Sequence, residues 1–252
     1  MDLKLRGKKV ILTGGSRGIG RATLEIFAEE GCDVAFFSRN PDQVAETRAK
    51  LAAYGGKVFG EAFSMGDDAR YREWLVRAAD YLGGADIFVH NVSSSGAGGG
   101  NDWQMTLNLD IMGAVSGCAA LQPYLEKSSS ASVIFLSSTA ATETFFGPNA
   151  FNSLKAALIT YGKHLSQAWG PKGIRVNIVT PGPIVFAGGN WERIGESKPE
   201  LLAATANKSV LGRLGEPAEV ARTIVFLASP MSSFTTGANV VIDGGYTKRV
   251  QL

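Results

Sequence analysis

The chain has 252 residues, of which 45% are hydrophobic and 19% charged, and its 25 basic against 23 acidic side chains give a formal net charge of +2. This length suits one large α/β domain with a sizeable core, and the near-neutral charge argues against a nucleic-acid binder, whose signature is a clustered basic surface. Two cysteines, no signal-peptide core and no run of about 18 apolar residues predict a cytoplasmic protein without a disulfide framework, a metal site or a membrane span.

Short β-branched and aromatic runs alternate with longer amphipathic segments along the chain. This alternation favours right-handed crossovers and a parallel sheet with helices on both faces. We therefore expect one α/β domain over residues 1–252, a Rossmann-type doubly wound sheet of about seven strands. The predicted strands are Lys9–Thr13, Asp33–Phe37, Lys57–Phe63, Asp86–His90, Ser132–Ser137, Arg175–Thr180 and Asn239–Ile242. The predicted helices are Gly20–Glu30, Pro41–Tyr54, Ala69–Leu82, Gln104–Glu126, Asn149–Trp169 and Pro217–Ala228.

Two stretches, Ser93–Asn101 and Phe186–Asn207, break this alternation. Both follow the carboxyl end of a predicted strand, which is where ligands bind in open α/β sheets. We therefore expect both stretches to wall a substrate site, with residues 186–207 acting as a lid. Surface loops without a role in binding are the alternative for such segments.

The first predicted strand ends in a glycine-rich run, residues 13–20, in which the next helix begins. Glycine is needed where the backbone turns sharply and where amides must approach a pyrophosphate without a Cβ between them. Such a turn can be only a tight connection, but its place in a strand–helix–strand unit at the start of the chain is typical of dinucleotide binding. We therefore expect cofactor contacts from Gly14, Ser16, Arg17, Gly18, Ile19 and Gly20.

The end of the second predicted strand indicates which dinucleotide binds. A carboxylate there would bind the ribose 2′-hydroxyl of NAD, whereas an arginine accommodates the 2′-phosphate of NADP. Ser38 and Arg39 stand at this place, and the next acidic residue along the chain is Asp42. Because Arg17 can join Arg39 around the same phosphate, the sequence predicts NADP(H) as the cofactor.

Further motifs follow in order along the chain. Asn91 follows the fourth predicted strand, Asn108 lies on the next predicted helix, and Ser138 follows the fifth strand, ahead of Lys155. The remaining motifs are Asn177, Pro181-Gly182, Gly212-Arg213, Glu216-Pro217, Thr236-Gly237 and Asp243-Gly244-Gly245. Together with the glycine loop, they resemble the short-chain dehydrogenase/reductase family, including its 3-oxoacyl reductases, over nearly the whole chain.

The resemblance implies an oxidoreductase that transfers a hydride between nicotinamide and a carbonyl or alcohol carbon. In the family a tyrosine hydroxyl exchanges the proton on oxygen, and a lysine one helical turn later favours the ionised phenol. The resemblance implies that Lys155 is this lysine and also binds the nicotinamide ribose, that Ser138 holds the substrate oxygen, and that Asn108 supports a proton-relay water. It also implies cofactor contacts from Asn91, Pro181, Gly182 and Ile184.

The tyrosine position of this motif holds a phenylalanine, Phe151. Its separation from Ser138 is that of the family, so the residue is substituted in place and the alignment has not slipped. Phenylalanine has no proton to transfer, and losing a positioned general acid costs about 10²–10⁴-fold in rate. Tyr161 cannot replace it, because it lies about 15 Å further along the same predicted helix.

Three explanations of Phe151 are open. An engineered exchange of tyrosine would leave the rest of the site intact, in agreement with Ser138, Asn108 and Lys155. A natural phenylalanine would suit a substrate that needs no protein acid, such as a protonated imine. A catalytically silent NADP(H)-binding sensor or scaffold is the third explanation. We favour a reductase whose activity is strongly reduced or altered.

The candidate substrate walls are Ser93–Gly100, Thr139–Phe146 and Phe186–Arg193. They offer hydroxyls, one cation at Arg193, and aromatic rings that suit a medium-sized carbonyl or alcohol compound. A 3-oxoacyl thioester is the substrate that the family resemblance suggests. The aromatic candidates are Phe145, Phe146, Phe186 and Trp191, and anchoring in the core is the alternative role for these rings.

Two further expectations concern the core and the partners. His90, on a predicted buried strand, is interpreted as a structural residue. The small residues of the helices over 104–126 and 149–169 permit close packing between copies, and the family uses these helices in its tetramers. We therefore expect a homotetramer or homodimer, with neither nucleic acid nor membrane as a partner, although helices buried in a monomer would carry similar residues.

Overall fold

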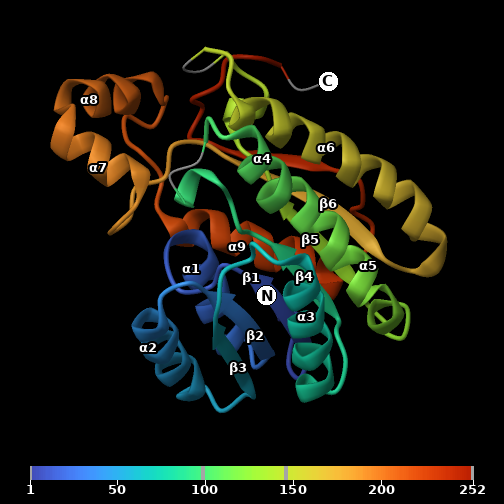
Figure 1. The fold of residues 1–252 in the computed structure, drawn as a ribbon. Coiled ribbons are helices and arrows are strands. Elements are labelled where there is room, and N and C mark those ends of the chain that lie inside the picture. The colour runs from blue at the N-terminus through green and yellow to red at the C-terminus, as the bar shows by residue number, and fades with distance from the viewer. Residues whose placement is uncertain (1, 98–99, 145–146, 251–252) are drawn as a thin grey trace.

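The computed structural model describes residues 2–97, 100–144 and 147–250 and contains one parallel sheet in the order β3-β2-β1-β4-β5-β6-β7 (Figure 1). This confirms the predicted doubly wound α/β fold class. Predicted and observed strands agree to within one or two residues at each end. The strands are β1 (Lys9–Thr13), β2 (Asp33–Ser38), β3 (Val58–Ala62), β4 (Ile87–His90), β5 (Ser132–Leu136), β6 (Arg175–Pro181) and β7 (Asn239–Ile242).

Helices cover both faces of the sheet, with α1, α2 and α9 on one side and α3, α5 and α6 on the other (Figure 1). Alternate residues of a strand point to opposite faces, so Leu12 of β1 packs with α1 and α9, while Ile11 packs with α3 and α5. The helices are α1 (Gly18–Glu29), α2 (Pro41–Ala52), α3 (Asp68–Leu82), α4 (Trp103–Thr106), α5 (Gly113–Leu125), α6 (Ala150–Trp169), α7 (Asn190–Ser197), α8 (Pro199–Lys208) and α9 (Pro217–Ala228).

The strand order reverses between β1 and β4, which lie side by side in the sheet. The chain runs outward from β1 to β3 and then returns to place β4 on the other side of β1. The loops that leave the carboxyl ends of these two strands therefore diverge and open a crevice, the usual ligand site of such sheets.

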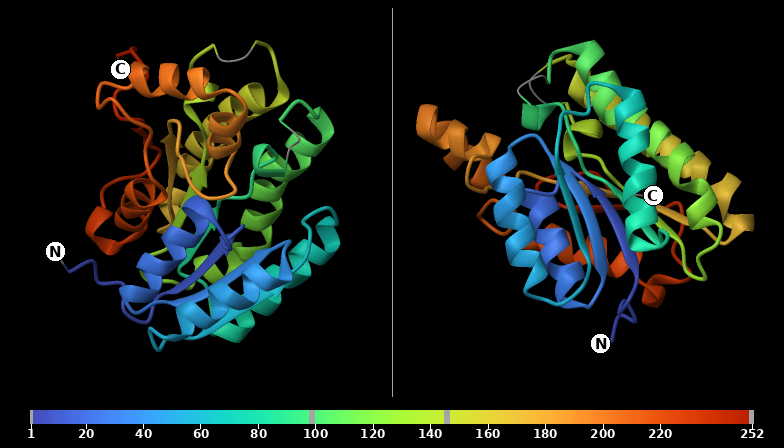
Figure 2. Two further views of the ribbon diagram at one scale, coloured as in Figure 1. Left: turned by 90° about the vertical axis from the view of Figure 1, so that its left-hand side faces the viewer. Right: turned by 60° about the horizontal axis from the view of Figure 1, so that its bottom comes forward.

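Two predicted segments differ from the structure. The predicted helix over 104–126 is divided by a π-helical turn, η2 (Leu107–Met112), between α4 and α5. The stretch over 186–207 holds two helices, α7 and α8, where the sequence showed only an interruption. Pro199 occupies the first turn of α8, where its missing N–H costs no hydrogen bond. Figure 2 shows both helices projecting beyond the end of the sheet opposite the N-terminus.

None of the described helices combines the length and apolarity needed to cross a bilayer. Within the described residues, His, Cys, Asp and Glu side chains nowhere gather in threes or more in a way that could hold a metal ion.

Candidate active site at the carboxyl ends of the strands

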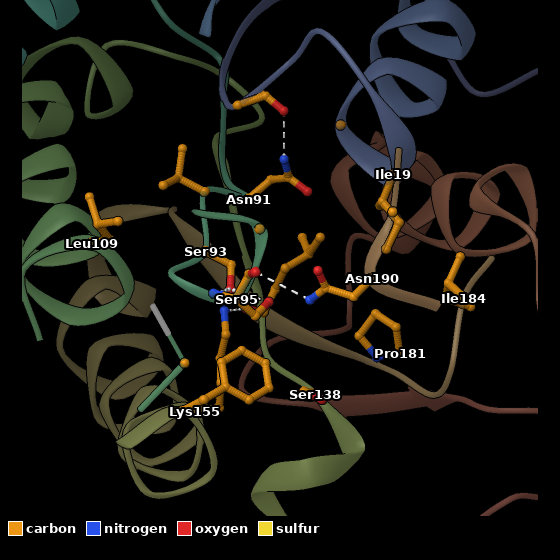
Figure 3. Close-up of a pocket in the computed structure, with 18 of the residues that line it drawn as sticks. Ile19, Asn91, Ser93, Ser95, Leu109, Ser138, Lys155, Pro181, Ile184 and Asn190 are labelled. Carbon is orange, nitrogen blue, oxygen red and sulfur yellow. Dashed lines mark hydrogen bonds between the residues drawn. The ribbon is translucent and has the colours of Figure 1, made fainter. Parts of the chain in front are cut away.

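A cleft of about 950 Å³ opens at the crevice between β1 and β4. Figure 3 shows Asn91 and Ile19 near its upper side, Lys155 and Ser138 near its lower side, and Pro181 and Ile184 on the right. Of the predicted site residues, Ser16 and Gly18 do not line the cleft. The others line it: Gly14, Arg17, Ile19, Gly20, Ser38, Arg39, Asn91, Asn108, Ser138, Phe151, Lys155, Pro181, Gly182 and Ile184.

The glycine loop brings the start of α1 against the cleft. Gly18 has φ +54°, a left-handed conformation that favours glycine, and a Cβ on Gly20 would overlap the carbonyl oxygen of Gly14. The first N–H groups of α1 have no partner within the helix, and the helix dipole favours negative charge there. This loop therefore has the shape and polarity that a pyrophosphate group needs.

Asn91 fixes the glycine loop against β4. Its Nδ2 donates hydrogen bonds to the carbonyl oxygens of Thr13 and Gly14, at 3.0 and 2.8 Å, and its backbone N–H donates to the Thr13 hydroxyl at 2.9 Å. The predicted contact residue Asn91 therefore shapes the loop through three bonds and also lines the cleft.

Positive charge gathers at one end of the cleft. Arg17 donates to the carbonyl oxygen of Gly96 at 2.8 Å, and Arg39 donates to the same oxygen at 3.3 Å. Partial burial, then the charges of Arg39 and Arg193, lower the pKa of Arg17 from its ordinary value. Two guanidinium groups that converge on one acceptor fit a phosphate, which takes bidentate charge-assisted bonds. Ser38 stands beside them, with its Oγ 2.7 Å from that of Ser16.

The reaction end of the cleft combines Ser138, Phe151 and Lys155. Asn149 caps α6 by accepting from the backbone N–H of Asn152 at 2.9 Å, so Phe151 and Lys155 fall in the first two turns of the helix. The Ser138 side chain is half-buried and accepts from the backbone N–H of Ala140 at 3.2 Å. The Nζ of Lys155 lies 5.8 Å from the centre of the Phe151 ring. The predicted ring and ammonium thus face the same cleft, one turn apart.

Lys155 is held by two acceptors and is only 2% exposed. Its Nζ donates to the Leu136 carbonyl oxygen at 2.6 Å and lies 2.9 Å from Oδ1 of Asp110 in the π-helical turn. Burial alone would raise the pKa of the Asp110 carboxyl, but the Lys155 ammonium and the Ser94 N–H outweigh it and hold that pKa below its ordinary value. The lysine therefore forms a buried ion pair with Asp110 at the edge of the cleft.

Asn108 lines the cleft, and its support of a proton-relay water stays a prediction. Asn108 is exposed and accepts from the Gln104 side chain at 3.0 Å, whereas Asp110 contacts Lys155. The π-helical turn changes which side chains face inward, and a regular helical period cannot reveal this. Asp110 was missed for that reason, although a lone carboxylate between Leu109 and Ile111 is a signal that could have identified it.

His90 is fully buried beside this pair, in agreement with its interpretation as a structural residue. Its Nε2 lies 3.1 Å from the Leu109 carbonyl oxygen, which can only accept, so Nε2 carries the proton. Nδ1 then accepts from the Thr13 hydroxyl at 3.4 Å. The imidazole thus joins β1 to the π-helical turn that carries Asp110.

Burial, then the charge of Lys155, lowers the pKa of His90 to about 4. Between pH 6.5 and 4 the unfolded chain therefore binds more protons at this residue than the folded chain does, and the free energy of unfolding falls as the pH falls. We expect this residue alone to remove roughly 3 kcal/mol of stability over that range. Chemical denaturation at a series of pH values measures the slope.

The control for this prediction is a comparison of two histidine variants. His90→Asn should flatten the pH dependence in that range, whatever it costs at neutral pH, while His164→Asn should not, because His164 is exposed. Equal slopes for the parent and His90→Asn would show that His90 is not the titrating group.

The loop after β6 and the start of α7 close the cleft from the side of the predicted lid. Arg17 donates to the Gly188 carbonyl oxygen at 3.0 Å, and the Asn190 side chain donates to the Ser95 carbonyl oxygen at 3.2 Å (Figure 3). A Cβ on Gly18 would lie 2.7 Å from Cζ of Phe186, so the phenylalanine ring stands against the glycine loop.

The predicted substrate walls are found in part. Phe186 and Trp191 line the cleft, whereas Phe145 and Phe146 lie outside the described residues. Arg193 donates to the Asn190 side chain at 2.6 Å and does not line the cleft. Tyr246, which the sequence did not single out, does line it.

Comparisons with known proteins agree with this geometry. The protein-family model described as enoyl-(acyl carrier protein) reductase matches residues 14–247. Isoepoxydon dehydrogenase from Aspergillus clavatus is 38% identical over 246 residues, which cover 96% of this chain and 95% of that protein. L-Sorbose reductase from Gluconobacter frateurii, solved with NADPH and L-sorbose, has a TM-score of 0.90 at 27% identity and covers 99% of this chain and 100% of its own.

A second solved structure carries the same cofactor. The NADPH-bound short-chain oxidoreductase from Pseudomonas aeruginosa PAO1, described as containing an atypical catalytic center, has a TM-score of 0.85 at 29% identity and covers 96% of this chain and 98% of its own. The residues described above fit this cofactor, because a glycine loop faces the cleft at a helix start and two guanidinium groups converge beside it. The chain therefore belongs to the short-chain dehydrogenase/reductase family of oxidoreductases and binds NADP(H).

Proposed function

We propose that this protein transfers a hydride between NADP(H) and a small, neutral, hydroxyl-bearing carbonyl or alcohol compound. The observation that carries the proposal is the composition of the cleft away from the two arginines. Arg17, Arg39 and Lys155 are the charged side chains among the described residues that line it, and Lys155 is neutralised by Asp110.

The substrate end of the cleft offers amide and hydroxyl groups in place of charges. An anionic substrate would call for an unpaired arginine or lysine, and a cationic one for a free carboxylate. Amide and hydroxyl side chains both donate and accept hydrogen bonds, as the hydroxyls of a substrate do. The uncharged polar residues that line this end are Asn101, Asn108, Asn149, Asn152, Asn190, Ser138, Thr139 and Tyr246.

Two relatives support a substrate of this class. L-Sorbose, which the Gluconobacter frateurii enzyme binds, is a neutral hydroxylated ketone. The Aspergillus clavatus relative is named for the oxidation of isoepoxydon. We place the 3-oxoacyl thioester suggested by the family resemblance second, because the described wall has no free cation for an anionic carrier.

In this proposal each group of site residues has its own role. When bound, NADPH supplies the hydride that reduces the substrate carbonyl carbon. Ser138 holds the substrate oxygen, the glycine loop and Asn91 hold the pyrophosphate end, and Arg17, Ser38 and Arg39 hold the 2′-phosphate. Phe151 packs beside the reacting centre but supplies no proton.

A matched substrate panel tests the proposal. We expect NADPH oxidation with L-sorbose to exceed that with 2-hexanone by about 10–10²-fold in kcat/KM, because unpaired polar groups in the cleft penalise the ketone without hydroxyls. Asn101→Leu should raise KM for L-sorbose, while Asn207→Leu, on the exposed face of α8, should leave it unchanged.

Two outcomes would contradict the proposal in different ways. Preference for a 2-oxo acid or an acetoacetyl thioester would overturn the proposed substrate class, but the proposed oxidoreductase activity would still stand. NADPH binding without turnover of any compound, in the parent and in Phe151→Tyr, would favour the sensor or scaffold.

We also propose that the chain forms a homotetramer or homodimer in the cytoplasm. Around η2, large apolar side chains stand exposed, with Trp103 58% and Met112 43% accessible, on the helix that we expect at the interface. Cys32 and Cys118 are both buried and free, which suits a reducing compartment.

A further inference from the structure

The proposed function assigns no role to the buried ion pair between Lys155 and Asp110. Its side chains are 2% and 0% exposed. Removing two charges from water is costly, and removing one partner of such a pair is strongly destabilising. A pair of this kind at the edge of the reaction end of the cleft calls for a chemical explanation.

The surroundings hold Asp110 in one orientation. Its Oδ2 accepts from the Ser94 N–H at 2.9 Å, and the Ser94 hydroxyl accepts from Thr106 at 3.0 Å. His90 holds the backbone next to it through the Leu109 carbonyl oxygen. The carboxylate is therefore directed at Nζ of Lys155 by three neighbouring elements.

An ammonium carries three N–H groups, and Lys155 donates one of them to the Leu136 carbonyl oxygen. The ammonium also forms an ion pair with Oδ1 of Asp110 at 2.9 Å, and the side chain lines the cleft. At least one N–H therefore remains for a group in the cleft, beside the hydroxyl-bearing Ser138.

The pair also changes what this lysine can do to a phenol. A free ammonium lowers the pKa of a neighbouring tyrosine, because it stabilises the phenolate. Asp110 cancels most of that field at a distance of 2.9 Å. Of the other ionisable groups packed against the pair, His90 of β4 is neutral at neutral pH, with its pKa lowered to about 4 by burial and by Lys155. The site is thus poorly suited to activating a phenol, and it contains none at position 151.

We propose that Lys155 itself is the proton donor to the substrate oxygen, and that Asp110 is the positioning residue that holds its ammonium at the edge of the cleft. This rests on the proposed function. As the carbonyl carbon gains the hydride, the π electron pair moves to oxygen, which bonds a proton from Nζ directly or through one water. The N–H bonding pair stays on nitrogen as the lone pair of a neutral amine, and solvent returns the proton.

Tyr246 is the rival donor, because its phenol lies in the same cleft. Burial, then the charge of Glu143, raises the pKa of Tyr246 above its ordinary value. If Tyr246 donates, Tyr246→Phe should abolish most of the turnover. If Lys155 donates, that variant should act mainly on KM, because Tyr246 lines the substrate end of the cleft while no positioned acid is lost.

The kinetic test asks whether one substitution, Asp110→Asn, raises or lowers the rate of reduction in the parent and in Phe151→Tyr. Asp110→Asn keeps the shape and the acceptor for Ser94 but removes the negative charge. In the parent it should lower the rate of reduction about tenfold, because the buried ammonium loses the carboxylate that positions it. In Phe151→Tyr the same change should raise the rate about tenfold, because the freed ammonium now acts on a phenol. Structural damage would lower both rates.

A spectroscopic titration tests the charge argument without substrate or cofactor. The ultraviolet absorbance of tyrosinate, with the parent as background, reports the pKa of the phenol introduced by Phe151→Tyr. Adding Asp110→Asn should lower this pKa by about 1–3 units. No change in this pKa, a loss of rate in both backgrounds, or inactivity of Tyr246→Phe alone would each overturn the inference. If all variants bind NADPH but none reduces any compound, the proposed function fails with it.

Discussion

Replacing Phe151 by tyrosine is expected to raise the rate of carbonyl reduction about tenfold, and about 10²-fold together with Asp110→Asn, because the phenol is a positioned general acid whose activation by Lys155 is limited by the paired Asp110. The change adds one hydroxyl to a ring whose place is already set. The backbone N–H of Phe151 donates to the Gly100 carbonyl oxygen at 3.0 Å, and the helix cap at Asn149 is unaffected. The new hydroxyl would project into the cleft that Ser138 also lines. Single-turnover oxidation of bound NADPH, measured against pH, gives the rate of the chemical step.

Two comparisons make this prediction specific to the phenol. Phe151→Leu removes the ring without adding an acid, so it should not exceed the parent, and the NADPH affinity of Phe151→Tyr should stay within about threefold, because uniform binding is not altered. A rate unchanged within threefold would mean that proton transfer does not limit this chain. In that case a substrate that needs no protein acid, such as a protonated imine, becomes the better explanation of the phenylalanine.

The layout of the sheet was predictable because its signals are local. β1, β7 and α9 have the predicted ends exactly as observed, since apolar runs and the Pro217 helix start mark them without tertiary information. α7 and α8 were not predicted, because helices this short depend on their neighbours more than on propensity. The glycines at 188 and 189, which precede α7, also read as loop signals.

The same distinction between local and tertiary signals separates the site residues that the sequence predicted from those that it did not. The glycine loop, Arg39 and Lys155 were found because each stands at a fixed distance from a strand or within one helix. Asp110 and Tyr246 were not, because the position of each depends on structure that no short motif records. Asp110 faces Lys155 only through the π-helical turn, and Tyr246 reaches the cleft from the C-terminal segment beyond β7.

The second large effect concerns the choice of cofactor. Arg39→Asp should weaken NADPH binding by about 10²-fold and NADH binding by less than about threefold, because it removes a charge-assisted bond to the 2′-phosphate and adds repulsion. Arg39 tests this better than Arg17, because Arg17 also donates a hydrogen bond to Gly188 in the predicted lid segment.

Fluorescence titration of both dinucleotides at two salt concentrations measures this effect. The preference of the parent for NADPH should shrink at high salt, since exposed charges are screened, while Arg39→Asp should show little preference at either. Arg222→Asp is the matched control, because Arg222 is exposed on α9 and lies outside the cleft wall. If the control loses NADPH affinity as strongly, the effect is one of overall charge. If NADPH and NADH affinities fall together in Arg39→Asp, this arginine supports the loop and does not bind the 2′-phosphate. If Arg39→Asp loses affinity for NADPH but not for NADH, the guanidinium at the end of β2 selects the cofactor.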